Sequence, residues 1–141
     1  MLKYAKINFN HRKDLVDYGD LIEIVFPGNR NQQHAAACIF FETKWADGLV
    51  SNLSYLEKQY GISRRILQRA RAKLAHLGII EYISSFNKKY NGQSGWKLST
   101  RFERSLKLLA ERCTYFRDTK TSVKEKDSLI LTFNDAKRRA P

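Results

Sequence analysis

The sequence predicts an α+β fold that is mainly α-helical, with short helices followed by a β-hairpin and then by one more helix. Three observations carry this prediction. Gly61 and Gly78 each follow a run of residues with helical apolar spacing, and glycine commonly ends helices. The segment after Gly78 changes to a partly alternating apolar pattern, which is typical of a strand. From about Thr100 to Phe116 the helical spacing returns.

The N-terminal part has the weakest pattern. KINFN and LIEIVF read as strand-like segments, and a Pro-Gly pair in FPGNRNQ breaks regular structure. We therefore expect residues 1–33 to form an N-terminal extension with short strands. A first helix is expected from His34 to about Trp45, and both Trp45 and Trp96 are expected in the core. The apolar side of this helix would consist of Ala37, Phe40, Phe41 and Trp45.

Two helices joined by a tight turn form the clearest pattern. Ser54 followed by Glu57 fits a capping box that begins one helix, and Gly61 suits the left-handed residue that ends it. Ser63 fits the cap of the next helix, which would end at Gly78. Because so short a turn cannot bring two helices antiparallel, they must cross steeply, as in a helix-turn-helix. The apolar positions of the second helix are Ile66, Leu67, Ala70, Leu74 and Leu77.

A β-hairpin is expected next, formed by IIEYISSF and WKLST around NKKYNGQSG. Asn91-Gly92 is the sharpest turn signal in this loop. The domain of helices and hairpin would span 34–101, followed by a helix over 102–117 and a charged, loosely ordered tail over 118–141 with one short strand at LILTF.

The last helix carries a stripe of apolar residues spaced four, three, four and three. The stripe consists of Phe102, Leu106, Leu109, Cys113 and Phe116, and is called the apolar stripe below. It fits two interpretations: packing against the domain's own core, or a homodimer contact. Five such positions do not by themselves establish a coiled coil.

The segment LSYLEKQYGISRRILQRARAKLAHLGII resembles the winged helix-turn-helix family of DNA-binding domains. The resemblance covers about 28 residues closely and roughly 34–101 loosely. It implies a three-helix core with a β-hairpin wing, and a second helix that enters the major groove. Arg71 departs from the family pattern, which usually has an apolar residue there. The matching positions are Gly61, Ser63, Ile66, Leu67, Ala70, Leu74, Gly78, Ile79 and Ile80.

The charge distribution indicates a polyanionic partner. The formal net charge is +12, and residues 58–101 hold ten basic residues against the single acid Glu81. Solvated helix faces normally mix acids with bases, because like charges at helical spacing destabilise a helix. Such an excess favours nucleic acid first and an anionic membrane surface second.

The resemblance implies which residues would contact DNA. Arg can pair with guanine and Gln with adenine in the major groove, whereas lysines on a wing would contact phosphates. Ser54 and Ser63 could also act only as helix caps, the helix face could be merely solvated, and the hairpin could be an ordinary polar turn. The predicted DNA-binding residues are Ser54, Ser63, Arg64, Arg65, Gln68, Arg69, Arg71, Lys73, Lys88, Lys89, Tyr90, Asn91 and Gln93.

No catalytic or metal-binding pattern is present. The sequence has no GxxxxGK[ST], HExxH or GxSxG motif, and its two cysteines and three histidines are scattered. We expect no enzyme activity, no cofactor and no metal. The longest apolar run is too short to span a bilayer, and a signal-peptide pattern is lacking. We therefore expect a cytoplasmic protein, nucleoid-associated or in a host cytoplasm.

These observations lead to one expected function and two alternatives. The expected function is sequence-specific binding of double-stranded DNA by a transcriptional regulator, with residues 64–77 in the major groove and residues 88–93 on the backbone. One alternative is a replication, partition or recombination factor of a mobile element. The other is a winged-helix protein-interaction module. A homodimer through the apolar stripe is compatible with each.

Overall fold

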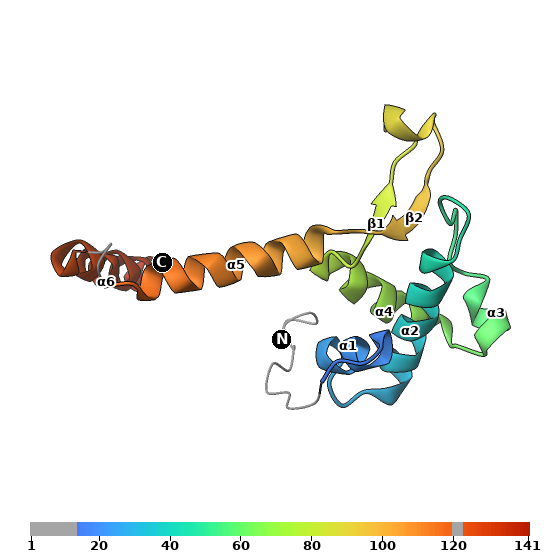
Figure 1. Cartoon of the computed structure of the whole chain (residues 1–141), viewed down its shortest axis with the longest axis horizontal. Coiled ribbons are helices and arrows are strands. Elements are labelled where there is room, and N and C mark those ends of the chain that lie inside the picture. The colour runs from blue at the N-terminus through green and yellow to red at the C-terminus, as the bar shows by residue number, and fades with distance from the viewer. Residues whose placement is uncertain (1–13, 120–122) are drawn as a thin grey trace. The chain divides into compact units, whose positions relative to one another are not determined.

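The computed structural model describes residues 14–119 and 123–141, and the chain divides into two compact units, one ending at Phe102 and the other beginning at Glu103. The chain is mainly helical with one two-stranded antiparallel hairpin (Figure 1), so the predicted α+β class is confirmed at this level. The elements are α1 (Tyr18–Val25), α2 (Arg30–Lys44), α3 (Leu56–Tyr60), α4 (Arg64–Leu77), β1 (Ile80–Ile83), the 3-10 turn η1 (Lys88–Tyr90), β2 (Gly95–Leu98), α5 (Arg101–Arg117) and α6 (Lys124–Arg139).

Residues 21–25 of the segment LIEIVF belong to helix α1, so the predicted strand is wrong. A capping box begins α1: the Asp17 carboxylate accepts a hydrogen bond from the Asp20 N–H at 3.2 Å, and the Asp20 carboxylate accepts from the Asp17 N–H at 3.4 Å. Ile22 and Val25 lie one helical turn apart and are buried in the core. Burial of such side chains outweighs the low helix propensity of β-branched residues. The other predicted N-terminal strand, KINFN, lies outside the described residues.

Helix α2 begins at Arg30, four residues before the predicted start. Asn29 caps it, and its side-chain oxygen accepts from the Gln32 N–H at 3.0 Å. The predicted apolar side is only partly right: Phe40 packs against the core, but Phe41 is exposed and Trp45 is 70% exposed. The side of α2 that packs against the core carries mostly smaller side chains. It includes Ala35, Ala36, Cys38, Ile39 and Thr43. Small side chains there allow the backbone of a neighbouring helix to approach closely.

Helices α3 and α4 are joined by the predicted tight turn. Gly61 has φ 63° and Gly78 has φ 87°, both in the left-handed region that favours glycine at helix ends. The Ser63 hydroxyl accepts from the Ile66 N–H at 3.3 Å, so the predicted cap of α4 is confirmed. The predicted capping box at Ser54 does not form. There the Ser54 N–H donates to the Asn52 side chain at 2.8 Å, and the helix begins two residues later.

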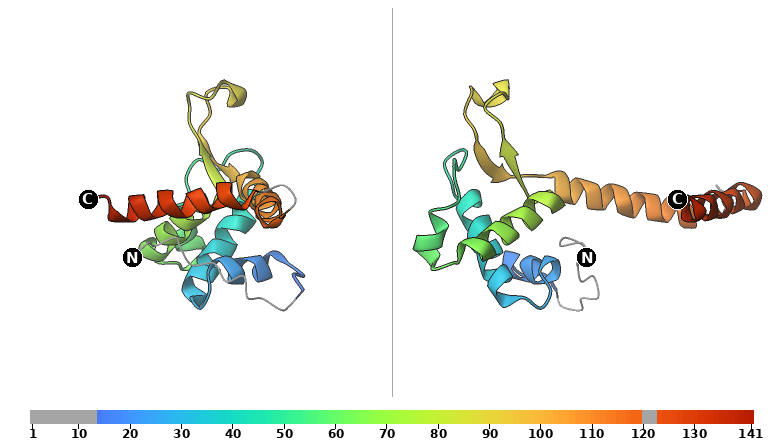
Figure 2. Two further views of the ribbon diagram at one scale, coloured as in Figure 1. Left: turned by 90° about the vertical axis from the view of Figure 1, so that its left-hand side faces the viewer. Right: turned by 180° about the vertical axis from the view of Figure 1, so that it is seen from behind.

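The hairpin pairs Ile80 with Leu98 and Ile83 with Gly95. Val50 forms a β-bridge to Trp96 of strand β2. The Val50 N–H donates to Trp96 O at 2.9 Å, and the Trp96 N–H donates to Val50 O at 2.7 Å. A Cβ at position 95 would meet the Val50 oxygen at 2.7 Å, so this approach requires glycine. Figure 2 shows that the hairpin projects from the side of the first unit opposite to α1.

The first two residues of α5, Arg101 and Phe102, belong to the first unit. The Phe102 N–H donates to Gly78 O at 3.1 Å, and the Phe102 ring packs against the hydrophobic core. The rest of the apolar stripe is not buried in the core: Leu109 is 59% exposed and Phe116 is 68% exposed. Intramolecular packing of the apolar stripe is therefore confirmed only for Phe102 within the part of the chain that the structure describes.

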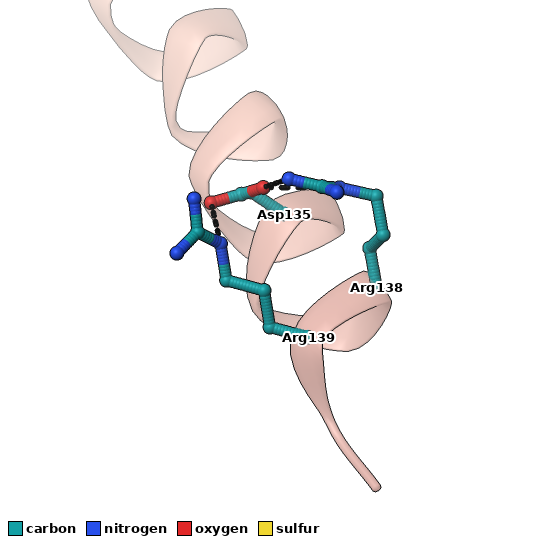
Figure 3. Close-up of polar contacts among 3 residues, drawn as sticks. All are labelled: Asp135, Arg138 and Arg139. Atoms are coloured by element: carbon teal, nitrogen blue, oxygen red, sulfur yellow. Dashed lines mark hydrogen bonds and ion pairs between the residues drawn. The ribbon is translucent and has the colours of Figure 1, made fainter.

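Residues 124–139 form helix α6, so the prediction of a loosely ordered tail with a strand at LILTF is wrong. Asp135 pairs with Arg138 at 2.6 Å and with Arg139 at 3.0 Å, one turn later on the same side (Figure 3). Acids in the first turn and bases in the last turn complement the helix dipole. No residue of α6 is buried, and its exposed apolar side chains include Leu129, Ile130, Leu131 and Phe133.

Candidate nucleic-acid interface

Helix α3 is held against α2 by one carboxylate. The Tyr55 hydroxyl donates to Glu42 Oε1 at 3.0 Å, and the Tyr60 hydroxyl donates to Glu42 Oε2 at 3.3 Å. Partial burial and then the bond to Glu42 raise the pKa of Tyr55 to about 12, so both hydroxyls stay protonated donors at neutral pH. Because α3 leads into α4 through a tight turn, this contact helps to fix the position of α4.

Helix α4 lies with one side in the core and the other in solvent. Leu67, Ala70 and Leu74 are buried, whereas the exposed side carries four of the predicted DNA-binding residues. These four are called the α4 face: Arg64, Arg65, Gln68 and Arg69. Among residues 14–119 and 123–141, no carboxylate forms an ion pair with the arginines of the α4 face. Their charge is uncompensated within the described chain.

The start of α4 adds a further attraction for anions. Its first turn contains no acidic residue, and Arg64 and Arg65 are its first two residues. The N-terminal end of a helix carries a partial positive charge from its unsatisfied N–H groups. The arginines of the α4 face therefore add their charge to the positive end of the helix dipole.

Arg71 and Lys73 are less exposed than the four residues of the α4 face. The Arg71 guanidinium lies over the Trp96 ring at 5.5 Å and is half-buried, which explains how an arginine occupies a usually apolar position. Lys73 is only 7% exposed, and its ammonium lies over the Phe26 ring at 4.8 Å. Burial lowers the pKa of Lys73. The structure thus places Lys73 with the core, apart from the other predicted site residues.

The contact between Arg71 and Trp96 relates α4 to the hairpin. Arg64 precedes Arg71 by seven residues, so both lie on the same side of the helix, and Gln68 lies between them. This side of α4 is the one turned toward β2, because Trp96 belongs to β2. The α4 face therefore continues toward the hairpin within one unit.

The hairpin tip, residues 84–94, is an ordered turn. Asn91 and Gly92 have φ values of 53° and 76°, and the Gln93 N–H donates to Tyr90 O at 3.0 Å, which confirms the turn predicted at Asn91-Gly92. The Asn87 side chain accepts from the Lys89 N–H at 3.0 Å. Lys88 and Lys89 are exposed at this tip, and they form no ion pair with a described carboxylate.

Comparisons with family models, curated proteins and solved structures find no match to this chain.

Glu81, the one acid of residues 58–101, is occupied away from α4. It pairs with Lys97 at 3.6 Å and accepts from the Ser99 hydroxyl at 3.2 Å. The Lys97 ammonium also lies over the Tyr90 ring at 5.7 Å. The pKa of Lys97 is raised, and the main cause is its hydrogen bond with Tyr90. The acid of this segment thus stabilises the base of the hairpin and leaves the α4 face uncompensated.

Two residues near the interface were not predicted from the sequence. Lys97 was missed because its place beside Tyr90 depends on the strand register. Phe86 lies on the hairpin tip and is 91% exposed, although the pattern of IIEYISSF suggested an ordinary strand residue. Ser54 is exposed in the turn before α3 and makes none of the predicted side-chain caps.

Metal-ligating side chains and thiols are scattered over the described residues. No group of three or more metal-ligating side chains occurs in residues 14–119 and 123–141. Cys38 is buried, Cys113 is exposed, and both are free thiols. No helix in this part of the chain is both long and apolar enough to cross a membrane.

Proposed function

We propose that the protein binds double-stranded DNA and reads its sequence. The observation that carries this proposal is the α4 face: three exposed arginines and a glutamine on one side of a helix, with no described carboxylate to compensate them. Arginine and glutamine are the side chains that pair in a bidentate manner with guanine and adenine. A solvated face without a partner would more commonly alternate acids and bases.

The proposed mode is that of a winged helix-turn-helix. Helix α4 enters the major groove with its N-terminal half nearest the bases, and α3 crosses behind it. The hairpin acts as the wing, on which Lys88 and Lys89 contact backbone phosphates. The close turn at Gly61, the exposed side of α4 and the projecting hairpin each support this arrangement.

Transcriptional regulation is the process we propose, with occlusion or recruitment at a promoter as the mechanism. The same interface would serve a replication, partition or recombination factor of a mobile element. We also propose a homodimer, because the apolar stripe beyond Phe102 is exposed and a dimer would present two α4 faces to two half-sites about one helical turn apart.

Fluorescence anisotropy with a labelled random duplex over a salt series tests DNA binding. Neutralisation of several phosphates gives a log–log slope of about −4 or steeper. Arg30→Ala is a matched control, because Arg30 begins α2 at the end of the unit away from the hairpin and its loss lowers the net charge by the same amount as an α4 variant (Figure 1). Absence of binding at low salt would overturn the proposal and favour an acidic protein partner.

A further inference from the structure

Most of the apolar stripe on α5 is a surface without a partner. Leu109 is 59% exposed, Phe116 is 68% exposed and Cys113 is exposed, and Leu106 is only half-buried. No residue of α5 is buried in the described structure. Contiguous exposed apolar residues of this kind mark an interaction surface.

The spacing of the apolar stripe is typical of a helix that packs against another helix. Positions 106, 109, 113 and 116 follow the three–four alternation of the a and d positions of a heptad. Phe102 continues this spacing, but its ring packs against the core of the first unit and its N–H bonds to Gly78. Four layers therefore remain free to meet a partner.

We propose that the α5 helices of two copies pair antiparallel and cross at the level of residue 111 along the helix axis. In antiparallel pairs an a position meets a d position, and this register is the one that uses all four free positions without Phe102. It sets Leu106 against the partner's Phe116 and Leu109 against the partner's Cys113, and each contact occurs twice by symmetry. The inference rests on the proposed homodimer and is independent of DNA binding.

Charges beside the stripe favour the antiparallel direction. In this register Glu103 lies beside the partner's Arg117 at both ends, and one like-charge contact joins the two Arg112 side chains. A parallel pair would instead set Arg112 beside the partner's Arg117 twice, with no compensating attraction. Each such contact changes a dissociation constant about twofold, so the charges select direction and the apolar layers supply affinity.

The pair also needs apolar area beyond the four layers, because independent coiled coils usually extend over at least three heptads. Leu108 and Tyr115 are seven residues apart on one flank of α5 and are 57% and 50% exposed. Helix α6 has a free apolar side of its own that matches this need. It consists of Leu129, Ile130, Phe133 and Ala136. We therefore expect α6 to cover the flank of the α5 pair.

Disulfide crosslinking of the full chain distinguishes the two directions. In the antiparallel register the two Cys113 residues are offset by four residues, about 6 Å along the helix axis, in addition to the lateral separation of the helices. Cα atoms more than about 7 Å apart do not form a disulfide without backbone movement. Mild oxidation of the wild-type protein should therefore give no crosslinked dimer.

Leu109→Cys changes this outcome, because the introduced thiol would face the partner's Cys113. The single variant should crosslink on a non-reducing gel, whereas Leu109→Cys combined with Cys113→Ser should not. Cys113→Ser alone is the matched control, since it retains only the buried Cys38. A parallel pair would crosslink both the wild type and the double variant, and either band would overturn the antiparallel arrangement while leaving the homodimer intact.

Sedimentation of the wild-type protein without DNA tests the dimer itself. A monomer at all accessible concentrations would overturn both the homodimer and this inference, and would leave DNA binding to be judged by anisotropy. Arg117→Glu is an independent check of direction. It should weaken the antiparallel dimer about tenfold, because two attractions become repulsions, but it should strengthen a parallel dimer.

Discussion

Removal of the two lysines on the hairpin tip should change the salt dependence of DNA binding by a calculable amount. Five exposed cations without a described carboxylate partner lie on the proposed interface: Arg64, Arg65, Arg69, Lys88 and Lys89. If each neutralises one phosphate, the log–log slope on random duplex is about −4.5, since each phosphate contributes about 0.9. Lys88→Ala combined with Lys89→Ala should reduce the slope to about −2.7 on the same scale.

The loss should be the same for every DNA sequence, because phosphate contacts carry no base information. Arg65→Ala and Arg69→Ala should behave differently: each should cost about 1–3 kcal/mol on a selected site and relax the base preference. Anisotropy over a salt series, on random and selected duplexes, measures both effects, with Arg30→Ala as the charge-matched control. An unchanged slope after loss of both lysines would refute the placement of the hairpin on the backbone. Equal losses on all sequences for the arginine variants would refute base reading by α4.

Three further predictions concern the fold that presents this interface. Glu42→Ala should lower the free energy of unfolding in urea by about 1–2 kcal/mol, because it removes two tyrosine hydrogen bonds at a partly exposed site. An unchanged urea midpoint would contradict the role of Glu42 in holding α3. Burial and the bond to Glu42 raise the pKa of Tyr55 from 10.0 to about 12. Between pH 10 and 12 the folded protein therefore keeps a proton that the unfolded chain loses, so the free energy of unfolding should fall as the pH rises through this range. Tyr55→Phe should flatten that fall. Leu74→Ala should lower the free energy of unfolding by about 3 kcal/mol because Leu74 is fully buried, whereas Phe86→Ala should change it by less than about 0.5 kcal/mol because Phe86 is exposed. Equal unfolding midpoints for the two variants would contradict these burial assignments.

The pair α3–α4 was predictable because its signals are local. Gly61, Ser63 and Gly78 act through their own backbone conformation or through a bond three residues away, so the chain needs no distant contact to define these ends. The Asn91-Gly92 turn is local in the same sense. The failed cap at Ser54 shows the limit of such signals, because Asn52, two residues earlier, bonds to the Ser54 N–H instead.

Predictions failed where packing with a distant segment decides the structure. LIEIVF is helical because Ile22 and Val25 enter a core formed largely by later helices, and a short β-branched run does not reveal that environment. The core side of α2 carries alanines rather than the larger Phe41 and Trp45, because close approach to a neighbour favours small residues. A ranking of residues by hydrophobicity alone selects the wrong side.

The sequence by itself determined the mainly helical class, the ends of α4, the hairpin turn and the concentration of positive charge, since each depends on local conformation or on composition. Only the tertiary structure decided which cations are available to a partner. Lys73 and Arg71 have the same charge as the arginines of the α4 face, but Lys73 lies in the core over Phe26 and Arg71 lies against Trp96. Exposure is a property of what packs around a side chain, and those neighbours come from segments far away in the chain.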